Sequence, residues 1–313
     1  MFGFLRRRRA ADGLTGLCVL PEGIAFAHVR REAGRVRLAA CTFRACSPET
    51  GARRETLQAL VREHGLTGSD CVVVMEPGAY QLLQVEAPAV PPEELRAAVR
   101  WQVRDLLDYH IDDAVIDVFD VPGDERPGRP MYVVAARVEA VQAHVDLVAA
   151  SGLELQAIDI VELALRNVAA HLPGAEQGLA FVRLRAGEGL ILIVRQDAIQ
   201  LARNVEFGSA GPAQAGGTPA ADALHDTLAL EVQRSLDYYD SAFRKAPITR
   251  VAVAPFEGDA RSLAEHLHEA LGLAAETVDL NEILTPPAPV EPRVQALALE
   301  AVGGALRTEE RSL

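Results

Sequence analysis

The same arrangement of β-strands occurs twice in this chain, once at its start and again after its midpoint. Apolar stretches separated by turn residues predict a first triplet of strands at residues 14–20, 24–30 and 35–43. A second triplet is predicted at residues 179–185, 190–195 and 198–205, and each triplet leads into a helical pattern and a further short apolar strand. A chain of 313 residues also divides into two lobes more often than it builds one core. We therefore expect an α/β protein whose two lobes share a topology.

Helical and strand patterns alternate in the rest of the chain. Apolar runs predict further strands at residues 71–75, 80–85, 114–121, 131–138 and 155–159. A helix is expected from Pro91 to Leu107, since proline suits the first helical turn, and its apolar face would carry Trp101. A last helix at residues 294–306 follows a proline-rich connector at residues 286–289, which would let it return to the first lobe.

Composition excludes several classes of function. The chain has 31 basic and 44 acidic residues and a formal net charge of −13, whereas nucleic-acid binding needs a basic face. Lys245 is the only lysine, which argues against Schiff-base or P-loop lysine chemistry. The apolar runs are too short for a membrane-spanning helix, and the N-terminus does not have the order of a secretion signal. The cysteines are expected to be reduced thiols in or near the core: Cys18, Cys41, Cys46 and Cys71.

Two groups of potential metal ligands have unsuitable spacing. His266 and His268 lie two residues apart on an expected helix, where their side chains point about 200° apart. A second group of aspartates lacks the glycine and the spacing of a calcium loop: Asp112, Asp113, Asp117 and Asp120. We expect both groups to be solvated surface residues and predict no metal site.

Several segments, taken in their order along the chain, carry a resemblance to a known family. They read MFGFLRRRR, PPEELRAAVRWQVRDLL followed by IDDAVID, GLELQAID followed by LALRN, and EVQRSLDYY. Together they resemble the type IV pilus assembly protein PilM over almost the whole chain. The resemblance implies the two-lobed actin-like (ribonuclease H-like repeat) fold, with an extra subdomain in the first lobe and a reduced second lobe. The short second lobe and the sequence from Trp101 to Asp108 most resemble MshI, the MSHA-pilus member of the group.

The resemblance also divides the chain. It implies a basic tail at residues 1–12, a first-lobe core at 13–76, the extra subdomain at 77–151, an interlobe segment at 152–177, a second lobe at 178–285, and the connector with the returning helix at 286–313. The Gly/Ala/Pro-rich stretch at residues 207–221 is expected to be a mobile loop, and it leaves little chain for a nucleotide-covering subdomain.

The positions that bind nucleotide in actin-like ATPases have changed here. Those proteins hold phosphate and Mg²⁺ between two hairpins that each carry Asp-x-Gly, because aspartate positions the ion and glycine admits the anion. The matching residues here are Cys18 and Leu20 in the first hairpin and Arg183 and Arg185 in the second, and a glycine-rich adenosine loop matches Pro255, Phe256 and Glu257. The two arginines would either attract phosphate or point outward from a half-exposed strand, and we favour the outward orientation. We expect no ATPase activity and no cofactor.

The family resemblance implies a scaffold that works through its partners. We expect a non-enzymatic, cytoplasmic protein at the inner membrane that binds the cytoplasmic tail of a PilN-like membrane protein, and the pilus motor ATPase is a further candidate partner. The tail is expected between the first-lobe meander and the Pro91 helix, near Tyr80, Leu82, Trp101 and Arg104. Without the family resemblance, Trp101 would be interpreted as a buried core residue. Two alternatives stay open: a nucleotide-responsive actin-like assembly ATPase, and a GspL-like component of type II secretion.

The N-terminal tail is a candidate contact with the membrane surface. Phe2, Phe4 and Leu5 precede four consecutive basic residues: Arg6, Arg7, Arg8 and Arg9. An arginine near an anionic leaflet contributes about 1 kcal/mol, and neighbouring apolar side chains can insert. The alternative is a solvated, frayed terminus.

Overall fold

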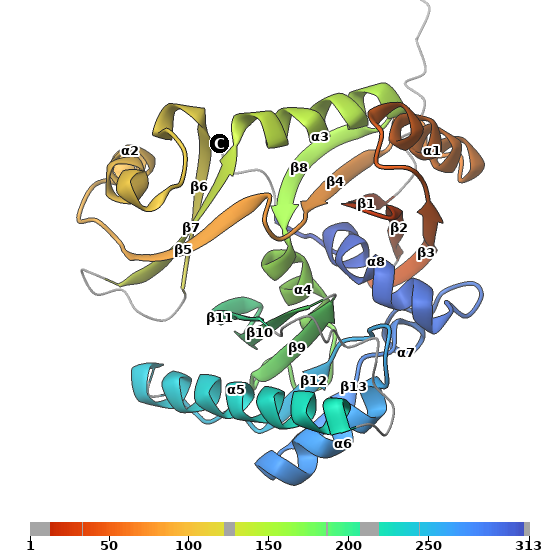
Figure 1. The fold of residues 1–313 in the computed structure, drawn as a ribbon. Helices are drawn as coiled ribbons and strands as arrows, with labels where there is room; N and C mark the ends of the chain where they lie inside the picture. The colour runs from red at the N-terminus through yellow and green to blue at the C-terminus, as the bar shows by residue number, and fades with distance from the viewer. Residues whose placement is uncertain are drawn as a thin grey trace, which may run out of the picture.

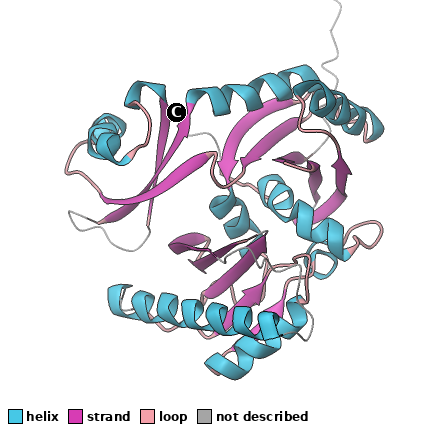
Figure 2. Cartoon of the chain, in the orientation of Figure 1, coloured by secondary structure: helices cyan, strands magenta, loops and turns pink. Residues whose placement is uncertain are grey.

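The computed structural model describes residues 13–32, 34–121, 129–185, 187–206, 219–243 and 245–309. Two expectations lie outside these residues: the basic tail with Arg6 to Arg9, and most of the loop at 207–221. The described chain forms three sheets with helices packed against them (Figure 1). Figure 2 shows helices on the outer faces of the sheets and further helices between the first and second sheets.

The first sheet contains the predicted N-terminal meander. Its strand order is β3-β2-β1-β4-β8, with antiparallel pairs in the meander and parallel pairs from β1 to β4 and from β4 to β8. The strands are β1 (Leu14–Leu20), β2 (Gly23–Glu32), β3 (Arg35–Ala45), β4 (Asp70–Met75) and β8 (Glu154–Ile160). Helices α1 (Thr50–Glu63) and α3 (Val138–Ser151) pack on one face, where alternate strand residues such as Leu17 and Phe26 are buried.

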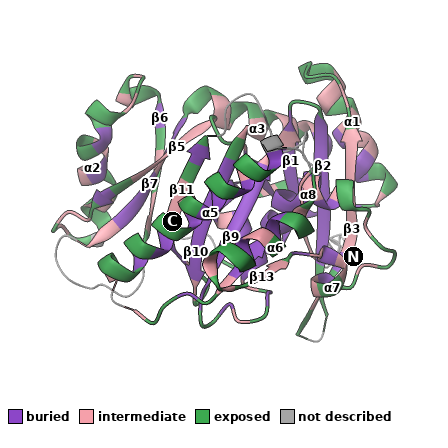
Figure 3. Cartoon of the chain, turned by 60° about the horizontal axis from the view of Figure 1, so that its bottom comes forward, coloured by how far each residue is buried: buried purple, intermediate pink, exposed green. Residues whose placement is uncertain are grey.

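The second sheet repeats the first. Its order is β11-β10-β9-β12-β13, with the same sequence of antiparallel and parallel pairs. The strands are β9 (Leu179–Arg185), β10 (Glu188–Arg195), β11 (Ala198–Glu206), β12 (Arg250–Val253) and β13 (Ala274–Thr277). Helices α5 (Pro219–Phe243) and α6 (Ala260–Leu271) cover its outer face, and the central strands beneath them are buried (Figure 3). The predicted repeat of the meander is confirmed.

The third sheet interrupts the first lobe between β4 and β8. Its order is β5-β7-β6, from β5 (Tyr80–Glu86), β6 (Ala114–Asp120) and β7 (Pro130–Arg137), and α2 (Pro92–Val103) covers one face. Short 3₁₀ turns at Arg104–Leu106 and Ile111–Asp113 connect α2 to β6.

The interpretation of Trp101 as a core residue is wrong. Its side chain is 72% exposed, whereas Val99 and Val103 of the same helix are fully buried. Positions four residues apart on a helix share a face, and the position midway between them points away from it. The apolar stripe of α2 that packs on the sheet is therefore the one through Val99 and Val103, and Trp101 faces solvent.

The last helix joins the lobes. Helix α8 (Pro292–Ala305) follows α7 (Leu280–Leu284) and packs on β1 to β4 and on α4 (Val161–Ala169), as the expected return to the first lobe requires. Two glycines permit this contact: a Cβ on Gly16 would lie 1.8 Å from the Ala301 carbonyl oxygen, and one on Gly303 would lie 2.1 Å from the Ala164 carbonyl oxygen. Any side chain at either position would displace α8 from its contact with β1 or α4.

Two further sequence expectations can be compared with the structure. Cys18 and Cys71 are buried and Cys41 and Cys46 are partly buried, which confirms that the cysteines lie in or near the core. In the described part of the chain, no helix is both long enough and apolar enough to cross a bilayer.

Candidate functional site

The two hairpins that would hold a nucleotide face each other across the lobe boundary, and an ion pair lies between them. Arg183 of β9 reaches Glu300 of α8, with Nε 2.8 Å and Nη2 2.7 Å from Oε1. The two side chains are only 4% and 2% exposed. A guanidinium and a carboxylate buried together compensate each other's loss of hydration, while either alone would be very costly.

The expected outward orientation of Arg183 and Arg185 is therefore wrong. The predicted alternation along β9 is correct, because Val182 and Leu184 belong to the core beneath α5 and α6. The opposite face does not meet water, however. Phe181 on that face packs in the core shared by α4, α8 and the first sheet, so the arginines that follow it point into the lobe boundary.

Arg185 widens the ion pair into a network. Its guanidinium lies 3.4 Å from Glu22 in the β1–β2 turn, 3.4 Å from Glu76 after β4, and 3.9 Å from Glu300. Three acidic residues held by separate elements on the first-lobe side thus converge on two arginines of the second lobe. We call these five residues the interlobe ion network: Glu22, Glu76, Arg183, Arg185 and Glu300.

The network sets the charge states around it. Burial alone would raise the pKa of Glu300, but Arg183 and Arg185 outweigh burial and hold that pKa below its ordinary value. Burial raises the pKa of Glu76 despite the opposing effect of Arg185. Burial also raises the pKa of the Cys18 thiol well above its usual range, and Glu300 and Glu76 add to that rise. Cys18 is thus a neutral thiol, which is unsuited to Mg²⁺, an ion that prefers oxygen ligands.

The other expected nucleotide positions are packed or engaged. Leu20 is fully buried, and Phe256 packs beside the core of the second lobe. Glu257, in the turn between β12 and α6, pairs with Arg293 of α8 at 3.0 Å. Pro255 lies in the same turn and is half-buried. Among the described residues, no group of three or more His, Cys, Asp or Glu side chains is placed to hold a metal ion.

The four residues predicted to hold a partner do not form one groove. Tyr80 donates a 2.5 Å hydrogen bond to Glu162, and Leu82 packs beside Tyr132, on the sheet face opposite α2. Trp101 lies on the outer side of α2, with the Arg104 guanidinium 5.5 Å from its ring centre. The space between α2 and the third sheet is filled by core side chains: Val85, Val99, Val103, Met131 and Val133.

A groove that the sequence did not predict lies between two sheet edges. Strand β6 ends the third sheet and β8 ends the first, and a pocket of about 350 Å³ separates them. Consecutive residues of both strands line the pocket, namely 117–119 and 158–160, so the strand edges themselves form its walls. Apolar and charged side chains share the walls: Phe119, Val134, Ile158, Ile160 and Leu163 are apolar, and Asp117, Asp159, Arg166, Arg307 and Glu309 are charged. We call this pocket the β6–β8 groove.

Charged residues close one end of the β6–β8 groove. Arg307 Nη1 lies 2.9 Å from the buried Asp159 carboxylate, and Glu309 pairs with Arg166 of α4. Burial raises the pKa of Asp159, although Arg307 opposes the rise. Arg307 and Glu309 also line a neighbouring pocket of about 290 Å³ with Leu14 and Gln156. The segment after α8 therefore forms a wall between two hollows along β8.

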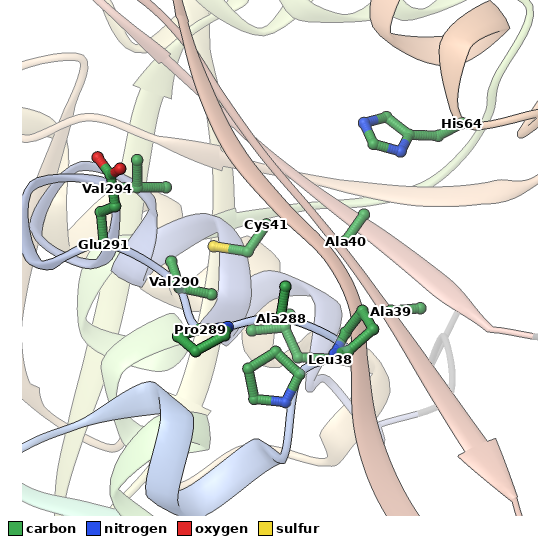
Figure 4. Close-up of a pocket in the computed structure, with 12 residues that line it drawn as sticks. Leu38, Ala39, Ala40, Cys41, His64, Ala288, Pro289, Val290, Glu291 and Val294 are labelled. Carbon is green, nitrogen blue, oxygen red and sulfur yellow. The ribbon is translucent and has the colours of Figure 1, made fainter.

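A third hollow lies at the opposite edge of the first sheet. The pocket in Figure 4 has a volume of about 320 Å³ and lies between edge strand β3 and the proline-rich connector. Its walls are mostly apolar, with Leu38 and Cys41 on one side and Pro289 and Val290 on the other. His64 and Glu291 are its polar members.

The comparison with protein families is decisive here. A family model of the type IV pilus assembly protein PilM matches residues 48–215, which is more than half of the chain. The chain belongs to the PilM family. The matched segment runs from before α1 to beyond β11, and so it includes the third sheet and both walls of the β6–β8 groove.

Solved structures agree with this PilM-family fold. A PilM–PilN type IV pilus biogenesis complex aligns with 94% of this chain and 97% of that chain, at 20% identity and a TM-score of 0.67. A Bacteroides thetaiotaomicron protein with an actin-like ATPase fold and unknown function covers 95% of this chain and 99% of its own, at 8% identity and a TM-score of 0.51. The actin-like fold predicted from the sequence is thus confirmed. No curated protein matches the chain.

Proposed function

We propose that this PilM-family protein is a non-enzymatic scaffold of type IV pilus assembly that binds an extended segment of a PilN-like membrane protein in the β6–β8 groove. The observation that carries the proposal is a pocket between two sheet edges, β6 and β8, whose walls contain both apolar and charged side chains. An extended peptide can form main-chain hydrogen bonds with a free strand edge while alternate side chains enter pockets. The related PilM–PilN complex supports the choice of partner.

Within this proposal, the protein works in the cytoplasm at the face of the inner membrane. The membrane protein supplies the peptide, so the groove need only bind a short tail. The short second lobe and the sequence from Trp101 to Asp108 favour an MSHA-like pilus system. The motor ATPase stays a predicted second partner.

The direct test is a titration with the labelled cytoplasmic tail of the PilN-like protein from the same genome, followed by fluorescence anisotropy. We expect saturable binding with a Kd of about 1 to 100 μM, since a short peptide gains modest free energy after its ordering cost. A scrambled peptide of identical composition is the control. Equal binding of both peptides would show that no sequence-specific groove exists.

The absence of enzymatic activity is also part of the proposal. The interlobe ion network occupies the lobe boundary with arginines where a nucleotide site needs aspartate and glycine. We expect no phosphate release from ATP and no rise in melting temperature with millimolar Mg·ATP. Binding at 100 times the dissociation constant would add about 2.7 kcal/mol to stability. A rise of several degrees would therefore reveal a working nucleotide site and contradict this part of the proposal.

A further inference from the structure

Two arginines oppose each other at the end of the β2–β3 hairpin. Arg30 and Arg37 are direct cross-strand partners, and both side chains are exposed. Like charges directly opposite each other destabilise an antiparallel pair. Within the described ranges, neither guanidinium forms an ion pair with an acidic side chain, although acidic residues outnumber basic ones by 44 to 31. An anion from outside the chain would relieve this repulsion.

The arginine pair stands at the mouth of an apolar hollow. Arg30 and Arg37 line a pocket of about 210 Å³ together with Glu32, Leu38, Ala39 and Pro287. Leu38, Ala39 and Pro287 also line the 320 Å³ pocket of Figure 4, so the two hollows are adjacent. Glu32 lies opposite Arg35 in the ladder, and the face shared by these four residues keeps two net positive charges. A basic mouth above an apolar groove matches a phosphate headgroup attached to an acyl chain.

The start of the fold lies at the same end of the hairpin. Gly13 adjoins Val29, the residue before Arg30, since a Cβ on Gly13 would lie 2.4 Å from the Val29 carbonyl oxygen. The sequence before Gly13 contains Arg6 to Arg9 with Phe2, Phe4 and Leu5. Basic residues with neighbouring aromatic and aliphatic side chains are the composition of segments that bind anionic membrane surfaces. This basic segment of the sequence therefore joins the described fold next to Val29 and Arg30.

We propose that Arg30 and Arg37 bind the phosphate headgroups of an anionic phospholipid surface, with the apolar hollow beside them receiving part of a lipid chain. The inference deepens the proposed function, because it rests on a position at the inner membrane. It also gives that position an orientation: the β2–β3 end faces the lipid. Arg31, on the other strand face, donates to the carbonyl oxygens of Leu306 and Arg307, at 2.7 and 3.0 Å, and Arg307 lines the β6–β8 groove. The lipid-facing end and one end of the groove are therefore adjacent, as the tail of a membrane protein would require.

The test measures co-sedimentation of the full chain with vesicles of phosphatidylcholine alone and with 30% phosphatidylglycerol, a composition chosen at about physiological anionic content. We expect binding to the anionic vesicles only. The double variant Arg30→Gln/Arg37→Gln should weaken binding about 30-fold, since each arginine near the surface contributes to affinity. The matched control is Arg96→Gln/Arg234→Gln, which changes net charge equally at two exposed arginines elsewhere, both 57% exposed.

Each outcome of this test has a distinct meaning. If the Arg30/Arg37 variant binds like the parent, the inference is wrong, and any membrane contact belongs to the tail. If the parent ignores anionic vesicles, both the inference and the membrane position fail. Peptide binding in the β6–β8 groove is measured without vesicles, so the proposed function is judged separately. If inorganic phosphate at millimolar concentration displaces the vesicles and protects the protein from heat, the pair is a site for free phosphate and the lipid assignment is wrong.

Discussion

Replacing Leu163 with glutamate is expected to remove peptide binding while leaving the fold intact. Leu163 extends from α4 into the β6–β8 groove and is only partly buried, so the new carboxylate can reach water in the free protein. A bound apolar peptide would trap that charge against Phe119 and Val134, at a cost of several kcal/mol. We expect the Kd of the PilN-like tail to rise at least about tenfold in the anisotropy titration.

Leu106→Glu is the matched control for this variant. Leu106 is 56% exposed in the turn after α2, away from the groove, and the substitution adds the same charge. Circular dichroism and melting temperature are measured to check that both variants fold. If Leu163→Glu and Leu106→Glu both bind like the parent, the β6–β8 groove is not the peptide site. If only Leu106→Glu loses binding, the partner lies near Trp101 instead, where part of the expectation from sequence placed it.

Replacing Glu300 with glutamine is expected to cause a large loss of stability. The substitution leaves the buried Arg183 guanidinium without its closest counter-charge, and breaking a buried ion pair on one side costs about 3 to 5 kcal/mol. For a protein of this size, we expect the melting temperature to fall by about 5 to 8 °C in a calorimetric scan. Glu257→Gln, which breaks the exposed pair with Arg293, should change it by less than about 2 °C.

Two further measurements separate the ion pair from general packing. The double variant Arg183→Met/Glu300→Leu removes both charges and should recover most of the stability, because well-packed apolar residues can replace a buried ion pair. The pH dependence has a defined sign. The folded-state pKa of Glu300 lies below its unfolded value, so its contribution is present at neutral pH and is lost as the pH falls through the folded pKa. Glu300→Gln should therefore melt closer to the parent in acid than at pH 7. Equal melting of parent and variant at pH 7 would contradict a stabilising interlobe ion network.

The architecture was predictable because its signals are local. Apolar alternation and turn residues mark each strand of the meander, and they occur twice, so residues 14–43 and 179–205 predicted the repeated sheets. The proline-rich connector likewise predicted that the last helix could return to the first lobe, and α8 packs there as expected.

The functional surfaces were harder to predict from the sequence, because they depend on which element covers each face of a sheet or helix. Alternation along β9 correctly separated Val182 and Leu184 from Arg183 and Arg185. It could not show that α8 brings Glu300 over the arginine face, since Glu300 lies 117 residues further along the chain. Trp101 was misplaced for a different reason: the sequence interpretation put it on the apolar face of the helix, whereas a residue two positions from both Val99 and Val103 points away from the face that they share. The β6–β8 groove needed the sheet order, because no local signal marks a strand as an edge.

The interlobe ion network has a consequence for when this scaffold acts. In a nucleotide-driven member of the fold, hydrolysis limits how long the lobes stay together and so sets a lifetime for each assembly. Here the lobes are joined by the side chains of the interlobe ion network, which are in place as soon as the chain has folded. In the scaffold that we propose, the two lobes therefore stay joined without a bound nucleotide. No hydrolysis rate limits how long they stay joined. The moment of assembly is then set from outside, by the supply of the membrane partner, and disassembly follows the dissociation rate of that partner's tail.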